Sequence, residues 1–266
     1  MTKKYQYILA EQDERVGIIS LNAPPNNSLS KKMIYEIFSV LDDWESRDDI
    51  RTVMFKSALP MFSGGANAPE LIAEMDAGET AGEESYSELG GRLVERIETY
   101  PKSTLVAATG KLFGGTTVLF SACDIRIGGE NLNLKDGDIY YGLVASWGMS
   151  SLRLPLWIGR NKVMDYMFLN EEFTGRQAYE LGLVSKVVPD EMVDEVGLSI
   201  AKKMSKAAPI AVRYYKECVR RSIYHDLAAA RAFELEASEI VYSTEDSKKG
   251  IANITAGIPY TDFDGK

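Results

Sequence analysis

The order of strand-like and helix-like segments constrains the fold of this chain more than any other feature of its sequence. Strand-like runs recur at residues 51–56, 103–108 and 124–128; the first two are apolar over residues 52–55 and 104–108, and helix-like segments follow them. Such an alternation predicts a layered α/β fold with right-handed crossovers between strands. Past Thr174 the pattern is helical only, which predicts a helical region toward the C-terminal end.

Composition excludes several classes of function. Of the 266 residues, 45% are hydrophobic and 26% charged, which is typical of soluble globular proteins. A formal net charge of −9 disfavours nucleic acid as a partner. We see neither a signal peptide nor an apolar run of about 20 residues, so we expect a cytoplasmic protein with no membrane partner. The two cysteines, Cys123 and Cys218, lack the spacing of metal ligands, so we predict no bound metal.

Two glycine-bearing turns are the best candidates for a functional site. Residues 61–67 (Met-Phe-Ser-Gly-Gly-Ala-Asn) and residues 110–116 (Gly-Lys-Leu-Phe-Gly-Gly-Thr) each follow a strand-like run and lead into a helix-like segment. Glycine at such a junction lets backbone N–H groups approach a ligand closely. Two N–H groups that converge on one carbonyl oxygen form an oxyanion hole, which indicates an enzyme acting on a thioester or another activated carbonyl. Two ordinary strand-to-helix turns are the alternative interpretation.

Further motifs give the chain a resemblance to the crotonase superfamily, the enoyl-CoA hydratase/isomerase family. The resemblance spans roughly residues 5–255 and rests on the order and spacing of these motifs: Phe62-Ser63-Gly64-Gly65-Ala66-Asn67, Gly110 with Gly114-Gly115, Ala122-Cys123-Asp124-Ile125, Gly142-Leu143, Leu154 with Ile158-Gly159, Thr174-Gly175-Arg176-Gln177-Ala178, Gly182-Leu183-Val184, and Thr244-Glu245-Asp246 with Gly250-Ile251. It implies an α/β fold of the ClpP/crotonase-like type, a spiral of ββα units. We place this core domain at residues 1–195 and a helical trimerisation region at residues 196–266.

The resemblance also implies substrate, partners and binding residues. The expected substrate is an acyl- or enoyl-CoA thioester, with no tightly bound cofactor beyond the coenzyme A of the substrate itself. Self-association as a homotrimer or hexamer is implied as well. By residue match, the N–H groups of Gly64 and Gly115 would bind the thioester oxygen and stabilise an enolate. Ala66 and Asn67 would contact the CoA adenine, although Asn67 replaces the usual Asp.

Proton transfer is where this chain departs from the family. Hydratases of the family usually carry one Glu three residues after the second-turn glycine and another about twenty residues later; Val118 and Asp138 occupy these positions. Because valine cannot carry a proton, the pattern favours single-carboxylate double-bond isomerisation by Asp138 over hydration. A turn residue in an Asp-Gly-Asp loop is the alternative interpretation of Asp138, and we expect its neighbour Asp136 to be a solvated turn residue.

The remaining pocket residues are expected from the same resemblance. Tyr140, Ser146 and Trp147 join Val118 as candidate pocket residues, and Trp147 is either a pocket wall or plain packing. Ser146 stands where dienoyl-CoA isomerases carry an Asp, which disfavours that activity. His225, the only histidine, is expected at a helix start on the surface, so nucleophilic catalysis by a Ser–His or Cys–His pair lacks a base.

Two other functions stay open on the sequence. Thioester hydrolysis, decarboxylation or dehydration, possibly on acyl-carrier-protein substrates, would keep the oxyanion hole without the paired Glu residues. A non-catalytic CoA-binding protein of the same fold is also consistent with Val118 and Asn67.

Overall fold

The computed structural model describes residues 5–77, 84–256 and 262–266. Its main sheet begins with an antiparallel hairpin, and every later strand of that sheet pairs in parallel. The strand order is β1-β2-β3-β4-β6-β9. The strands are β1 (Ile8–Asp13), β2 (Val16–Leu21), β3 (Thr52–Ser57), β4 (Ser103–Ala108), β6 (Ile125–Gly129) and β9 (Lys186–Val188). The alternation of strands and helices predicted from the sequence is thus confirmed.

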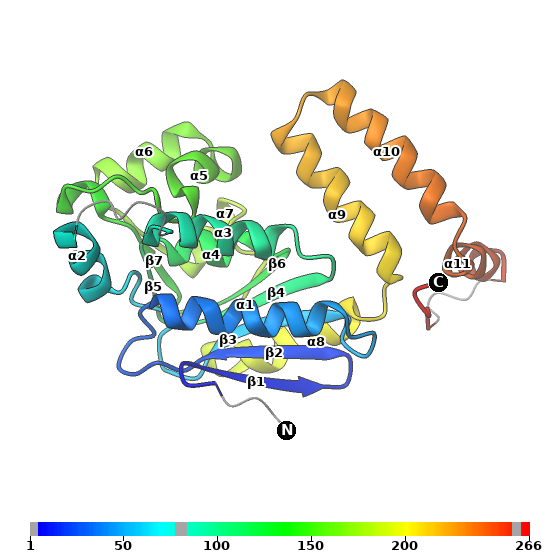
Figure 1. Ribbon diagram of the computed structural model, residues 1–266, viewed down its shortest axis with the longest axis horizontal. Coiled ribbons are helices and arrows are strands. Elements are labelled where there is room, and N and C mark those ends of the chain that lie inside the picture. The colour runs from blue at the N-terminus through cyan, green and yellow to red at the C-terminus, as the bar shows by residue number, and fades with distance from the viewer. Residues whose placement is uncertain (1–4, 78–83, 257–261) are drawn as a thin grey trace.

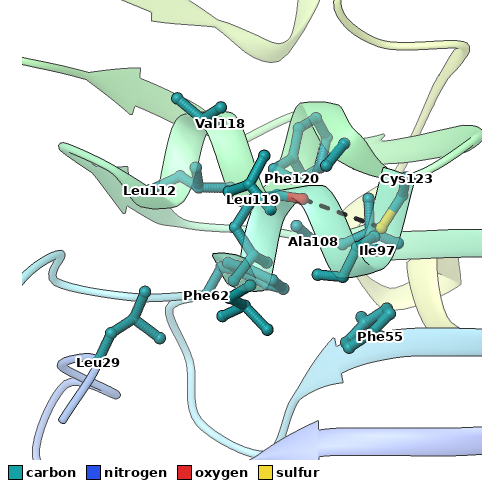
Figure 2. Packing of buried hydrophobic residues seen from close by; sticks show 14 of the residues in the cluster. Leu29, Phe55, Phe62, Ile97, Ala108, Leu112, Val118, Leu119, Phe120 and Cys123 are labelled. Carbon is teal, nitrogen blue, oxygen red and sulfur yellow. Dashed lines mark hydrogen bonds between the residues drawn. The ribbon is translucent and has the colours of Figure 1, made fainter. Parts of the chain in front are cut away.

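Both faces of this sheet are covered by helices. On one face lie α1 (Lys31–Glu45), α3 (Tyr86–Glu98) and α4 (Thr116–Ala122), and on the other lies α8 (Val193–Met204) (Figure 1). Along β4, Val106 and Ala108 join the core beneath the first group, shown in part in Figure 2, whereas Leu105 and Ala107 pack with α8. Side chains of a strand alternate between faces, so burial on both faces produces the continuous apolar run seen in the sequence.

A second, three-stranded sheet was not predicted. It consists of β5 (Lys111–Phe113), β7 (Asn133–Lys135) and β8 (Glu172–Thr174), with β5 parallel to β7 and β7 antiparallel to β8. β5 lies inside the second glycine turn. Because parallel strands end at the same edge of a sheet, the residues after β5 and those after β7 emerge next to each other.

Shorter helical elements connect the strands and the longer helices. They are α2 (Ala68–Ala77), α5 (Ser150–Ile158), α6 (Arg160–Phe168), α7 (Gly175–Glu180) and the 3₁₀ turns η1 (Asp138–Tyr141), η2 (Trp147–Met149) and η3 (Asp190–Met192). In the described ranges, no helix is both long enough and apolar enough to cross a membrane.

The C-terminal helices form an arm. α9 (Pro209–Tyr224) and α10 (Leu227–Tyr242) make a helical hairpin that projects away from the sheet, and α11 (Glu245–Ala256) follows (Figure 1). The predicted boundary between residues 195 and 196 falls inside α8, and the division of the chain at this point stays a prediction. Val193 and Ala201 of α8 are buried against the sheet, and Lys216 of α9 still pairs with Asp124 of the core at 2.8 Å.

Candidate active site

The fold brings the two glycine turns side by side. The N–H groups of Phe62 and Ser63 donate to the Lys111 carbonyl at 3.1 and 3.2 Å, and the Phe113 N–H donates to the Ser63 carbonyl at 3.1 Å. Gly65 has φ +92°, and a Cβ added there would lie 3.0 Å from the Phe113 carbonyl oxygen. Glycine is therefore required where the first turn passes β5.

Gly115 has the geometry of an anion-binding donor. It is the N-cap of α4, and the N–H groups of a helix's first turn have no acceptor within the helix. Among the described residues the Gly115 N–H has no backbone acceptor. The positive end of the helix dipole adds to the attraction for a negatively charged oxygen.

Gly64, the other expected donor, is engaged within the chain. Its N–H donates to the carbonyl oxygen of Asn26 at 2.7 Å, and a Cβ added at Gly64 would lie 2.6 Å from Nδ2 of the same residue. Asn26 belongs to the loop between β2 and α1 and was not singled out from the sequence, because nothing local links it to residue 64. A thioester oxygen can bind the Gly64 N–H only after it displaces the Asn26 carbonyl.

Asp138 begins η1, in the turn that follows β7. The Gly114 N–H donates to the Lys135 carbonyl at 2.8 Å, which fixes the turn after β7 against the second glycine turn. The Asp138 side chain is half-buried, and burial together with the neighbouring charge of Asp136 raises the pKa of its carboxyl to about 7. A carboxyl group with this pKa accepts and returns protons near neutral pH.

Asp136 is not the solvated turn residue that was expected. It has no exposed surface, because its turn is packed under other parts of the chain: a Cβ added at Gly137 would lie 3.4 Å from Asn170 and Tyr141 and 3.9 Å from Phe113. The N–H groups of Gly137 and Asp138 donate to Oδ1 of Asp136 at 2.7 and 3.2 Å. Its Oδ2 is buried and has no donor among the described residues.

Val118 occupies its expected place on α4 but faces no open space. It has no exposed surface, and Figure 2 shows it on the side of α4 away from Phe62. Gly148 packs against it: a Cβ added at Gly148 would lie 3.5 Å from Cβ of Val118 and 2.8 Å from Cγ2 of Val94. The position of the first family acid is therefore filled by apolar packing.

The Trp147 side chain packs beside Gly115. A Cβ added at either Gly90 of α3 or Gly115 would overlap its indole ring, so the ring lies between these two glycines. The side chain is buried, and its indole N–H has no acceptor among the described residues. Gly90 was not singled out from the sequence, because a glycine inside a helical segment does not reveal which side chain packs against it.

Two of the other candidate pocket residues are exposed. Ser146 accepts a hydrogen bond from the Ser87 hydroxyl, with 2.9 Å between the two Oγ atoms. The Tyr140 hydroxyl donates to the Phe168 carbonyl at 2.7 Å. Their contact with substrate stays a prediction.

The expected adenine-binding residues have structural contacts of their own. Ala66 forms a β-bridge with Leu29. Asn67 precedes α2, and its Oδ1 accepts a hydrogen bond from the Glu70 N–H at 3.2 Å. The contact of both residues with CoA stays a prediction.

His225, the only histidine, lies far from both glycine turns in the sequence. His225 is exposed but ends α9 instead of starting a helix; Asp226 caps the next helix, α10. Within residues 5–77, 84–256 and 262–266, no cluster of three or more His, Cys, Asp or Glu side chains is suited to a metal ion.

Comparison with known proteins places these features in a family context. Residues 11–255 match the family model described as enoyl-CoA hydratase/isomerase. The chain is 29% identical over 243 residues to a "probable enoyl-CoA hydratase" of Bacillus subtilis, covering 90% of this chain and 92% of the relative. It is 28% identical over 243 residues to a short-chain-enoyl-CoA hydratase of Clostridium acetobutylicum, with 91% of each chain covered.

Solved structures give the same result for the fold. An enoyl-CoA hydratase from Bacillus anthracis is 27% identical and matches with a TM-score of 0.86 over 98% of this chain and 100% of the other. An enoyl-CoA hydratase from Polaromonas is 22% identical, with a TM-score of 0.88 over 96% and 99% of the two chains. The expected spiral with a helical C-terminal region is confirmed.

Proposed function

The chain belongs to the enoyl-CoA hydratase/isomerase family, and within it we propose that the protein isomerises the double bond of an enoyl-CoA thioester. Asp138 is the group that moves the proton. The Gly115 N–H, joined by the Gly64 N–H, holds the thioester oxygen. CoA is the handle of the substrate, and Ala66 and Asn67 contact its adenine.

The observation that carries this proposal is the contrast between positions 118 and 138. Val118 is sealed in apolar packing, so only one of the two family positions offers a carboxyl group. The carboxyl of Asp138 has a pKa of about 7 and lies in the turn fixed against Gly114. One acid that both takes and returns a proton is sufficient for isomerisation, whereas the two-acid hydration mechanism requires a partner that is missing.

The chemistry proceeds in two proton transfers. The Asp138 carboxylate removes a proton from C2 of a 3-enoyl thioester, and the electron pair of that C–H bond delocalises onto the thioester oxygen. Backbone N–H donors stabilise the resulting dienolate. One such donor typically lowers the activation barrier by about 2.7–4 kcal/mol. Asp138 then delivers the proton to C4, the double bond moves into conjugation, and the carboxylate is regenerated without net gain or loss of protons.

Hydration is the second candidate because the relatives carry hydratase names. A single acid would then have to activate water and protonate C2 in turn. Hydration and isomerisation give different products from different substrates, so one set of assays separates them.

The test uses purified protein with a 3-enoyl-CoA and a 2-enoyl-CoA of the same chain length. Chromatography should show conversion of the first to its conjugated isomer, with slower formation of a 3-hydroxyacyl-CoA from the second. Asp138→Asn should reduce isomerisation by about 10²–10⁴-fold, the usual contribution of general acid–base catalysis. Undiminished turnover by this variant would remove Asp138 from the mechanism, and predominant hydration would favour the second candidate.

Self-association is part of the same proposal. Large apolar side chains are exposed on the arm, including Tyr215, Leu235 and Tyr242, and others on α5 and α6, including Leu152 and Phe168. Exposed apolar surface of this extent supports an interface, and the family resemblance supports a trimer or a dimer of trimers. Light scattering after size-exclusion chromatography should give three or six times the 29.5 kDa mass of one chain. A monomer at micromolar concentration would contradict the proposal.

A further inference from the structure

Asp136 lies beside Asp138 but cannot reach a substrate, because it has no exposed surface. Two backbone N–H groups, those of Gly137 and Asp138, donate to its Oδ1. Donors of this kind favour the ionised form of a carboxyl group. Its Oδ2 has no donor among the described residues, so only one of the two buried carboxylate oxygens accepts hydrogen bonds from the backbone.

Two ionised carboxylates are both hydrogen-bond acceptors and cannot bond to each other. The side chains of Asp136 and Asp138 are close enough to hydrogen-bond once Asp138 carries the proton. A proton held between them thus supplies a donor that the surrounding described residues do not provide. It also removes the repulsion between two adjacent negative charges.

We propose that Asp136 is a positioning residue: its buried carboxylate shares one proton with Asp138, so that Asp138 holds an abstracted proton firmly enough to carry it between two carbons. The inference rests on the proposed role of Asp138 in isomerisation. A carboxylate of ordinary strength is a poor base toward a C–H bond, and a stronger one is better matched to the task.

The other titratable groups around this pair do not replace Asp136. From α6, Tyr166 approaches with a buried hydroxyl whose pKa is raised by desolvation, so it is neutral. From β8, Glu172 forms an exposed ion pair with Lys135 of β7 at 3.0 Å, which solvent screens. Tyr140 of η1 is exposed and bonded to Phe168.

Burial and the charge of Asp136, in that order, raise the pKa of Asp138 to about 7. Burial raises the pKa of Asp136 as well, whereas the two backbone N–H groups and the Asp138 side chain lower it. The two groups therefore titrate as a coupled pair, and the donors on Asp136 favour its ionised form while Asp138 holds the proton. Removal of the Asp136 charge should abolish the electrostatic repulsion that raises the pKa of Asp138 and leave the effect of burial.

The test is a titration of the substrate-free protein by NMR, with ¹³C-labelled aspartate carboxyl groups. The signal lost in Asp138→Asn identifies Asp138. In Asp136→Asn, whose amide oxygen still accepts the two backbone N–H groups, the midpoint of the Asp138 signal should fall by about one unit or more while staying above the ordinary value. Glu172→Gln, which removes a nearby exposed carboxylate, should leave that midpoint unchanged.

Activity provides a second readout. The acid limb of the pH profile of kcat/KM for 3-enoyl-CoA should move to lower pH in Asp136→Asn by the same amount, which a purely structural role would not produce. An unchanged midpoint in a folded Asp136→Asn protein would overturn the inference. If that variant does not fold, Asp138→Ala decides: without the proton that Asp138 donates to it, Asp136 should titrate in a single step at higher pH than in the wild type, and an unchanged titration would overturn the inference.

The two proposals fail in different ways. A shifted Asp138 midpoint in a protein that does not isomerise enoyl-CoA would refute the proposed reaction and support the proton-sharing pair. Isomerisation by Asp138 with no effect of Asp136→Asn on either midpoint or pH profile would refute only the pair.

Discussion

Replacing the Asp138 carboxyl should make the folded protein more stable. The pKa of Asp138 is about 7 in the folded chain against an ordinary value of 3.8, so the folded state binds this proton more tightly than the unfolded state. Ionisation of Asp138 therefore lowers the free energy of unfolding. This loss of stability is zero below pH about 4, grows as the pH rises and reaches its full size above pH about 7. Asp138→Asn has no ionisation and should escape this cost.

The magnitude follows from the size of the shift. About three units at about 1.4 kcal/mol each give roughly 4 kcal/mol as an upper bound. Because the side chain is only half-buried, solvent screening reduces the expected gain to about 1–2 kcal/mol at pH 8. For a chain of this size that corresponds to a rise in Tm of roughly 2–8 °C.

The assay is thermal and denaturant unfolding of wild type and Asp138→Asn at pH 8 and at pH 5. The gain should be largest at pH 8 and shrink toward pH 5, while catalysis is lost at both. Asp165→Asn on α6, which removes an exposed carboxylate paired with Lys162 at 3.1 Å, is the matched control and should give no gain at pH 8. Equal or lower stability of Asp138→Asn at pH 8 would refute the argument that this carboxyl is held at a cost to the fold.

Two further predictions concern the packing around the site. Val118→Glu should not restore a two-acid hydratase, because it places a carboxyl in a fully buried apolar position, and it should lower the free energy of unfolding by about 3–5 kcal/mol in denaturant titrations; a stable variant with faster hydration would contradict this. Gly90→Ala should cost about 1–3 kcal/mol and reduce turnover, because the new methyl group overlaps the indole that lies against Gly115. Gly91→Ala on the same helix meets no atom within 4 Å and should be neutral or stabilising in the same unfolding assay; equal effects of the two variants would remove the steric explanation.

The long elements were predictable because their periodicity extends over several turns or a whole buried strand. α1 repeats apolar residues at helical spacing, with Met33, Ile37 and Leu41 all buried, and β4 is buried throughout and apolar from Leu105 to Ala108. The three-residue strands β5, β7 and β8 are too short to show any period. They nevertheless form the sheet that sets the turn after β7 beside the second glycine turn.

Candidate site residues can be proposed from the sequence where chemistry is carried by residue type and order, as for Gly115, Val118 and Asp138, whose roles stay predictions. It was not predictable where burial depends on distant segments. Asp136 looks like a turn residue in an Asp-Gly-Asp sequence, and only the packing around Gly137 by Phe113 and Asn170 shows that it is enclosed. The bond from the Gly64 N–H to Asn26 likewise joins residues that are far apart in the sequence.

The hydrogen bond from the Gly64 N–H to the Asn26 carbonyl would make the site bind a reaction intermediate more strongly than the substrate. An amide carbonyl accepts hydrogen bonds better than a thioester carbonyl, so a resting substrate competes poorly with Asn26 for the Gly64 N–H. A dienolate oxygen carries negative charge and accepts such bonds far more strongly. The second donor would thus be recruited mainly as charge develops, which directs its binding energy to the rate of the chemical step rather than to the affinity for substrate.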